Sequence, residues 1–314
     1  MIKNEHLGIL TVAIVVILCL IYVKQHSNTF QEDQYDEEFQ SNEELDSVPK
    51  EENVSEEKTE PIQEPNWIDW SPIKNVNQPL GKVLKDIESH LPNNHQYYDK
   101  DKIVWAHEAT HGINSNIRNS KNEGRWNGFY TLNNRAILIK EPSVTIKQVA
   151  DIVPEELKGP SYNLYLIQQR RDWDDCPLYL FDEWTAYTNG SECGIEGDLP
   201  GWKYSLFQAH NFNVYCLCLA MILDENYNDE QFKLSLIWNI NRTFELYELS
   251  KNKKLSNLSG SVTFEGQQVV FTDLSENMIE NYLKTIKECE GGAKLRVFMK
   301  NYLGSSFCKK HYNF

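Results

Sequence analysis

Positive charge and paired cysteine motifs are both scarce in this chain. Its 314 residues include 31 Lys and Arg against 46 Asp and Glu, which gives a net charge of −15, and no segment forms a basic stripe. A protein that binds nucleic acid needs such a stripe, so the composition argues against a nucleic-acid partner. No Cys-x2-Cys pair occurs. A structural zinc site made of Cys176, Cys193, Cys216 and Cys218 is therefore not favoured.

Histidine is also rare, with only 8 in the chain, which gives weight to one short motif. His107, Glu108 and His111 form the pattern H-E-x-x-H. Residues four apart lie on one face of a helix, so both imidazoles can face one metal ion. Glu108 lies about 100° around the helix axis from His107 and can reach a metal-bound water without becoming a ligand. The motif thus predicts a catalytic metal site.

The residues around the motif predict a buried helix over residues 101–118. The residues Asp99, Lys100 and Asp101 can cap its start and place negative charge in its first turn. Apolar or small side chains recur at spacings of three and four residues, as a helix facing a core requires; they are Ile103, Ala106, Thr110, Ile113 and Ile117. Gly112 costs about 1 kcal/mol relative to Ala inside a helix. A glycine there predicts that another part of the chain, or the metal region, comes close.

Two histidines do not complete a catalytic zinc site, which usually has three protein ligands and one position open to water. The metzincin extension is absent, because Asn114 and Ile117 occupy its glycine and histidine positions. The segment 181–190, FDEWTAYTNG, carries two carboxylates among aromatic residues, and a carboxylate is costly to bury unless it is paired or metal-bound. Glu183 is the predicted third ligand and Asp182 the acceptor for a histidine N–H. The reverse assignment stays open, as does an acidic pair that only complements the helix dipole.

This combination resembles the zincin metallopeptidases, and in particular the gluzincin arrangement, in which two motif histidines and a downstream glutamate bind zinc. The resemblance covers two short segments of the chain. It implies a zincin-like domain in which His107, His111 and Glu183 hold one Zn²⁺ per chain. It also implies that Glu108 is the general base when a zinc-activated water hydrolyses a peptide bond of a protein or peptide substrate.

Hydrolysis also needs a donor for the tetrahedral oxyanion besides the metal. Tyr187, one turn after Glu183, is the predicted catalytic donor, and His210 is the second candidate. His210 is also an alternative third metal ligand. A strand edge within residues 129–139 could bind an extended peptide by main-chain hydrogen bonds.

Two alternatives to a peptidase stay open. A zinc hydrolase could act on an amide of the cell envelope or on a small molecule, since fold and metal do not fix the substrate. The chain could also be a membrane-anchored interaction or structural protein whose motif binds no metal.

The N-terminal part predicts attachment to a membrane. Residues 7–23 form an uncharged apolar run, at the short end of what spans a hydrocarbon core as a helix. No small-residue cleavage site follows it, so we expect residues 1–24 to be an uncleaved signal anchor rather than a signal peptide. Lys3 precedes the run and an acidic stretch follows it, which places the catalytic domain of a single-pass membrane protein on the extracytoplasmic side. Residues 25–65 are dense in Glu and Asp and are expected to be a disordered acidic linker.

Six cysteines follow Cys19, and an even number is permissive for disulfides. Cys176 and Cys193 bracket the FDEWTAYTNG segment, where a bridge would be useful. Cys216 and Cys218 lie in an apolar run typical of buried thiols. Four sequons are permissive for glycosylation, at Asn53, Asn189, Asn241 and Asn257.

Residues 66–314 predict an α+β domain that is mostly helical with a small β-sheet. Two short runs, 128–132 and 135–139, predict a hairpin with Asn133 and Asn134 in its turn. A second strand pair is expected at 262–264 and 268–271. Besides the motif helix, apolar periodicity predicts helices over 79–91, 144–157, 163–171, 178–188, 207–223, 275–288 and 293–303.

Overall fold

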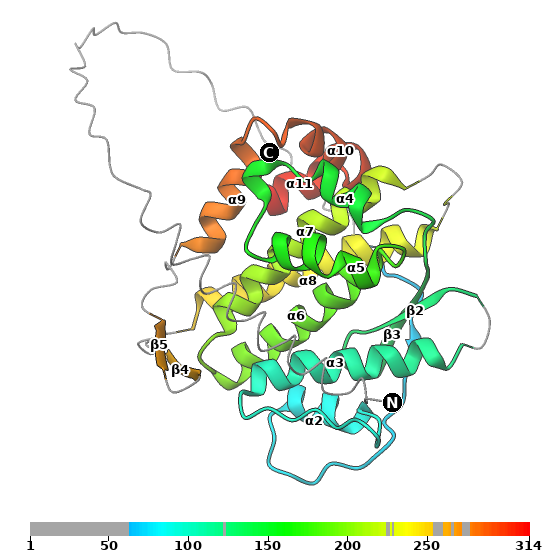
Figure 1. Cartoon of the computed structure of the whole chain (residues 1–314), viewed down its shortest axis with the longest axis vertical. Coiled ribbons are helices and arrows are strands. Elements are labelled where there is room, and N and C mark those ends of the chain that lie inside the picture. The colour runs from blue at the N-terminus through cyan, green and yellow to red at the C-terminus, as the bar shows by residue number, and fades with distance from the viewer. Residues whose placement is uncertain are drawn as a thin grey trace, which may run out of the picture. The chain divides into compact units, whose positions relative to one another are not determined.

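The computed structural model describes residues 63–121, 124–223, 227, 229–253, 260–264, 267–271 and 277–314. The predicted anchor lies outside these residues, as does the predicted acidic linker up to residue 62. Within the described part of the chain, no helix combines the length and the hydropathy needed to cross a bilayer. The architecture is α+β and mostly helical, as predicted, with a small three-stranded antiparallel sheet (Figure 1).

Helix α3, Lys102–Asn119, carries the H-E-x-x-H motif and closely matches the predicted range. Asp101 caps its start, because its side chain accepts hydrogen bonds from the backbone N–H groups of Ile103 and Val104 at 2.8 and 3.3 Å. Such a cap satisfies amides that the first turn of a helix leaves unpaired. The predicted apolar face of α3 is buried from Ile103 to Ile117.

Strands β2, Trp126–Tyr130, and β3, Arg135–Lys140, form the predicted hairpin. The short strand β1, Ile68–Asp69, pairs with the other edge of β3, so the antiparallel sheet has the order β1-β3-β2. In the turn, residues 132–134 all have positive φ angles, of 69°, 54° and 61°. Asparagine tolerates this region better than most residues, and two of the three turn residues are asparagine.

Three long helices follow the sheet in the chain: α6, Tyr179–Gly197, α7, Trp202–Ile222, and α8, Glu230–Lys251. Figure 1 shows α6 running alongside α3, with α7 and α8 beyond it. Helices α6 and α7 both extend past their predicted ranges, and α8 is an addition to the predicted set. The buried face of α8 includes the polar side chains of Asn239 and Arg242, which obscure its helical period.

The other elements are shorter. Helices α2, Lys82–His90, and α4, Ile146–Ile152, lie inside predicted ranges. The predicted helix over 163–171 is instead a π-helix, η2, Tyr162–Gln168, followed by the single turn α5, Arg170–Trp173. The rest comprises the 3-10 turn η1, Glu155–Leu157, the predicted strand pair β4, Gly260–Phe264, and β5, Gln267–Phe271, and helices α9, Met278–Glu288, α10, Ala293–Leu303, and α11, Ser305–Tyr312.

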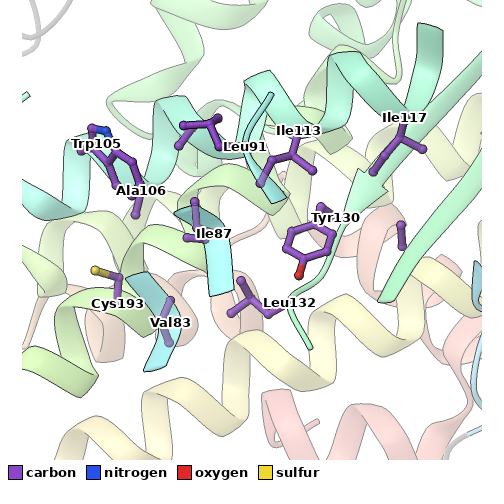
Figure 2. Close-up of a cluster of buried hydrophobic side chains, with 12 residues drawn as sticks. Val83, Ile87, Leu91, Trp105, Ala106, Ile113, Ile117, Tyr130, Leu132 and Cys193 are labelled. Carbon is purple, nitrogen blue, oxygen red and sulfur yellow. The ribbon is translucent and has the colours of Figure 1, made fainter. Parts of the chain in front are cut away.

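A hydrophobic cluster holds α3 against α2 and the sheet (Figure 2). Ile113 and Ile117 of α3 belong to it together with Ile87 of α2 and Tyr130 of β2, and all four side chains are fully buried. Burying a large apolar side chain contributes about 1.5–3 kcal/mol. The cluster therefore sets the position of the motif helix in the domain.

Helix α6 approaches α3 closely at Gly190. An ideal Cβ on Gly190 would lie 3.2 Å from a carbonyl oxygen of α3 and 3.6 Å from His107 Cβ. The neighbouring Asn189 is buried and donates hydrogen bonds to Thr110 Oγ1 at 3.2 Å and to the Tyr130 carbonyl oxygen at 3.0 Å. The Asn189 sequon is therefore closed to glycosylation in the folded domain, which corrects the prediction made for that site.

The six described cysteines are free thiols, so Cys176 and Cys193, where a bridge would be useful, are not joined. Cys193 is buried on α6 against a carbonyl oxygen of α3, whereas Cys176 lies beside Arg125. Cys216 and Cys218 are buried thiols, as predicted, and burial raises the pKa of Cys218 to about 12.

Candidate metal centre

Helices α3 and α6 bring together three side chains that could hold a metal ion. His107 and His111 come from consecutive turns of α3, and Glu183 comes from the N-terminal part of α6. Each residue offers one ligand atom, and these atoms lie within 4.8 Å of one another. No other group of this kind occurs in the part of the chain that the structure describes.

The spacing of the three atoms matches that of ligands around one small cation. His107 Nε2 lies 3.0 Å from His111 Nε2, and Glu183 Oε2 lies 3.4 Å from His107 Nε2 and 3.6 Å from His111 Nε2. Tetrahedral zinc with bonds of about 2.0–2.1 Å separates its ligands by roughly 3.3–3.4 Å. The observed separations bracket this value.

Glu183 supplies a second sign that the group fits a cation. Its Oε2 atom is buried and makes no hydrogen bond, and it faces the two imidazoles only at ion-pair distance. A buried carboxylate oxygen is costly unless it is paired or metal-bound. Only 6% of the Glu183 side chain is exposed, against 12% for His107 and 21% for His111. The centre is therefore closed on the α6 side and reaches solvent past the imidazoles.

The negative charge of Glu183 and the positive charge of protonated His111 stabilise each other. Burial opposes ionisation of Glu183, but the imidazoles of His111 and His107 hold the pKa of its carboxyl well below the usual range. Burial also opposes protonation of His111, yet the carboxylates of Asp182 and Glu183 raise its pKa well above the usual value. A metal ion bound here would replace the His111 proton as the positive charge beside Glu183, since metal ligands bind in their deprotonated forms.

Asp182 lies on the other side of the His111 ring. Its Oδ1 atom is 3.2 Å from His111 Nδ1, while His111 Nε2 faces His107 and Glu183. A carboxylate at Nδ1 keeps the proton on that nitrogen and leaves Nε2 free to bind a metal. Asp182 thus occupies the place predicted for an acceptor, and Glu183 the place predicted for a ligand.

Glu108 lies on the same turn of α3 as His107 and is outside the three-residue group. Two residues of the segment between α2 and α3 lie within the range of its charge. Burial lowers the pKa of His95, and the Glu108 charge acts in the opposite direction. Burial raises the pKa of Tyr97, and the charges of Asp99 and Glu108 raise it further. The ring of His95 also lies against Gly112, one turn beyond Glu108 on α3.

Three tyrosines surround the α6 side of the centre. The ring of Tyr187 lies against that of His107, with 4.4 Å between centroids, and its hydroxyl is 2.8 Å from that of Tyr165. Burial raises the pKa of Tyr179, and the charge of the nearby Glu183 raises it further. Tyr187 thus lies beside a motif histidine, and its role as a donor stays a prediction. Tyr165, which lies in η2, was not predicted as part of the site, because its contact with Tyr187 joins residues 22 apart in the chain.

His210 lies apart from the group. It is buried in α7 against the rings of Phe244 and Tyr247 of α8, and neither of its ring nitrogens has a hydrogen-bond partner. Burial lowers its pKa to about 3. His210 does not belong to the three-residue group, so its prediction as an alternative third ligand is wrong.

The edge of the hairpin is also partly closed to a substrate. On β2, the N–H group of Tyr130 donates to Asn114 Oδ1 at 2.6 Å, and its carbonyl oxygen accepts from Asn189 at 3.0 Å. The other strand of the hairpin, β3, is central in the sheet. An extended peptide therefore finds no free main-chain groups at Tyr130, which corrects the strand-edge prediction at that position.

Comparison of the chain with models of known protein families finds no match, and comparisons with curated proteins and with solved structures find none either. The group formed by His107, His111 and Glu183 is therefore the feature of the described residues that points to a function.

Proposed function

We propose that this chain is a zinc-dependent metallopeptidase of the gluzincin type. In this proposal His107, His111 and Glu183 bind one zinc ion, and Glu108 is the general base. The observation that supports it best is the spacing of the three ligand atoms, which lie 3.0, 3.4 and 3.6 Å apart. Two of them come from the H-E-x-x-H helix α3 and the third from α6.

The donor set favours zinc in a catalytic role. Two imidazole nitrogens and one carboxylate oxygen are ligands that catalytic zinc uses, with a fourth position left for water or substrate. The same set can bind non-haem iron in an octahedral site. Octahedral ligands with bonds of about 2.1 Å lie roughly 3.0 Å apart, and two of the three separations here are longer.

Each residue then has a separate task. Bound zinc would supply Lewis-acid polarisation of the scissile carbonyl and activation of water. Glu108 accepts the proton of the attacking water and later delivers it to the leaving amine. Tyr187, beside His107, donates its O–H to the oxyanion that develops on the carbonyl. Asp182 keeps the proton of His111 on Nδ1.

Metal analysis of the purified full-length chain tests the first half of the proposal. We expect one zinc per chain, lost in His111→Ala and in Glu183→Ala when both variants keep the wild-type circular dichroism spectrum. The exposed carboxylate of Glu155 provides the control, and Glu155→Gln should keep its zinc. No zinc after incubation with zinc at neutral pH, or one iron in its place, would overturn the assignment.

A digest of a mixed peptide library tests the second half. Glu108→Gln should keep one zinc and lose at least about 100-fold in cleavage rate, the size expected for removal of a general base. Cleavage that is unchanged in Glu108→Gln would contradict the mechanism. A zinc-loaded chain that cleaves no peptide would instead favour a hydrolase of other amides.

We also propose, from the apolar segment 7–23, that the chain is a single-pass membrane protein with its catalytic domain on the extracytoplasmic side. Fractionation should recover the full-length chain with membranes, and protease added outside intact cells should remove the domain. Recovery in the soluble fraction would overturn this part without affecting the zinc site.

A further inference from the structure

Asn114 lies one turn beyond the motif on α3 and has a contact at each end of its side chain. It is 1% exposed. Its Oδ1 atom accepts a hydrogen bond from the Tyr130 N–H at 2.6 Å, and its Nδ2 group donates to Asp182 Oδ1 at 2.5 Å. The backbone N–H can only donate, so the amide orientation is determined by its partners.

The same Asp182 oxygen faces His111. Asp182 Oδ1 lies 3.2 Å from His111 Nδ1, so one carboxylate oxygen is held between an amide donor from Asn114 and an imidazole N–H. The contacts run from the β2 backbone through Asn114 and Asp182 to the ring of a candidate metal ligand.

Only an amide side chain can both accept a hydrogen bond from the Tyr130 N–H and donate one to Asp182 Oδ1 at this position. An aspartate would place a second carboxylate against Asp182, and like charges at this distance disfavour each other. An apolar side chain would leave the buried Tyr130 N–H and one Asp182 lone pair without their present partner, which is costly.

We propose that Asn114 is a positioning residue for the metal centre, which acts through Asp182 to hold His111 with Nε2 directed at the metal. This inference rests on the proposed function, because it requires that His111 binds a metal. It extends the centre to a residue that contacts neither metal nor substrate, and it makes strand β2 part of the support of the site.

A double-mutant cycle on the full-length chain tests the proposal, with zinc affinity measured by competition against a chromophoric chelator. Asp182→Ala should weaken zinc binding about 10–100-fold, as loss of such a partner typically does, and Asn114→Ala should weaken it about tenfold. The double variant should bind zinc about as weakly as Asp182→Ala alone, because Asn114 has no effect once Asp182 is gone.

A merely structural role for Asn114 predicts a different result. Asn114→Ala would then lower the melting temperature with unchanged zinc affinity, or its effect would add fully to that of Asp182→Ala, and either outcome overturns the proposal. If Asn114→Ala does not fold, Asn114→Ser takes its place in the cycle, since a serine leaves room for a water at the Tyr130 N–H.

Asn119→Ala is the matched control on the same helix, because Asn119 is exposed and contacts Ser115. It should leave zinc affinity unchanged. A wild-type chain that binds no zinc would overturn the proposed function and this inference with it. If the wild-type chain binds zinc and Asn114→Ala binds it equally well, the inference is overturned and the proposed function is not.

Discussion

The ring of His95 lies against helix α3 where Gly112 has no side chain. An ideal Cβ on Gly112 would be 2.6 Å from His95 Nδ1 and 3.0 Å from His95 Cε1. The glycine inside the motif helix is thus explained by the close approach of the segment that follows α2, as the sequence predicts. Glu108 lies one turn before Gly112 on the same helix.

Gly112→Ala should destabilise the domain although alanine is the better helix former. Alanine gains about 1 kcal/mol from helix propensity, but the clash with His95 should cost about 1–3 kcal/mol. In a His95→Ala background the clash is gone, and Gly112→Ala should then stabilise. Urea unfolding of the four chains measures both effects. Equal stabilisation in both backgrounds would mean that His95 does not restrict position 112.

Asp182→Asn should weaken zinc binding about 10–100-fold while the fold stays intact. The asparagine keeps an oxygen for the Asn114 amide and for His111 Nδ1 but removes the negative charge that favours the imidazole N–H. Chelator competition gives the affinity, and far-ultraviolet circular dichroism checks the fold. Wild-type affinity in this variant would show that the contact between Asp182 and His111 does not support the metal.

Glu141→Gln should flatten the dependence of stability on pH. Glu141 is 8% exposed, and it accepts hydrogen bonds from the Leu178 N–H at 2.8 Å and from the Asn127 side chain. Burial raises its pKa from 4.5 to about 7, although both hydrogen bonds act to lower it. Because the folded-state pKa is raised, the contribution of Glu141 is fully present below pH 4.5 and is lost as pH rises towards 7.

The contribution of Glu141 to the free energy of unfolding that is lost in this way is on the order of 3 kcal/mol, at 1.36 kcal/mol per pKa unit. Free energies of unfolding at pH 5 and pH 8 should therefore differ less in Glu141→Gln than in the wild type. Glu155→Gln, at an exposed carboxylate, is the control and should leave the difference unchanged. An equal pH dependence in all three chains would rule out the raised pKa.

His210→Leu should stabilise the domain in acid and leave zinc content unchanged. The folded-state pKa of His210 is lowered by burial to about 3 from 6.5. The contribution of this residue is thus present above pH 6.5 and is lost as pH falls. Leucine is similar in size and carries no unpaired ring nitrogens. Thermal unfolding at pH 5 and elemental analysis check the two expectations, and loss of zinc would return His210 to the metal centre.

The local parts of the fold follow from local patterns. Helix α3 begins at Asp101 because that side chain caps it, and His107 and His111 share a face because they are four residues apart. The asparagines of the hairpin turn adopt positive φ angles. These features depend on neighbours a few residues away, so the sequence predicts them well.

Helix α8 and the π-helical character of η2 could not be predicted in the same way. The buried Arg242 of α8 donates hydrogen bonds to Asn189 and Glu192 of α6 at 2.8 and 2.7 Å. In the sequence, a charged residue on the inner face of a helix interrupts the apolar period. Its burial is explained only when its partners are known. Tyr165 of η2 likewise gains a partner only in the fold, at the hydroxyl of Tyr187.

The H-E-x-x-H face, the mostly helical class and the two candidate carboxylates follow from the residue pattern alone. The different positions of the two carboxylates depend on packing. The rotation of α6 about its axis, restricted by Gly190 against α3 and by the contact between Asn114 and Asp182, turns Glu183 towards both imidazoles and Asp182 towards His111 Nδ1. Helix period restricts which residues share a face, but the direction of that face is set by packing between segments about 70 residues apart in the chain.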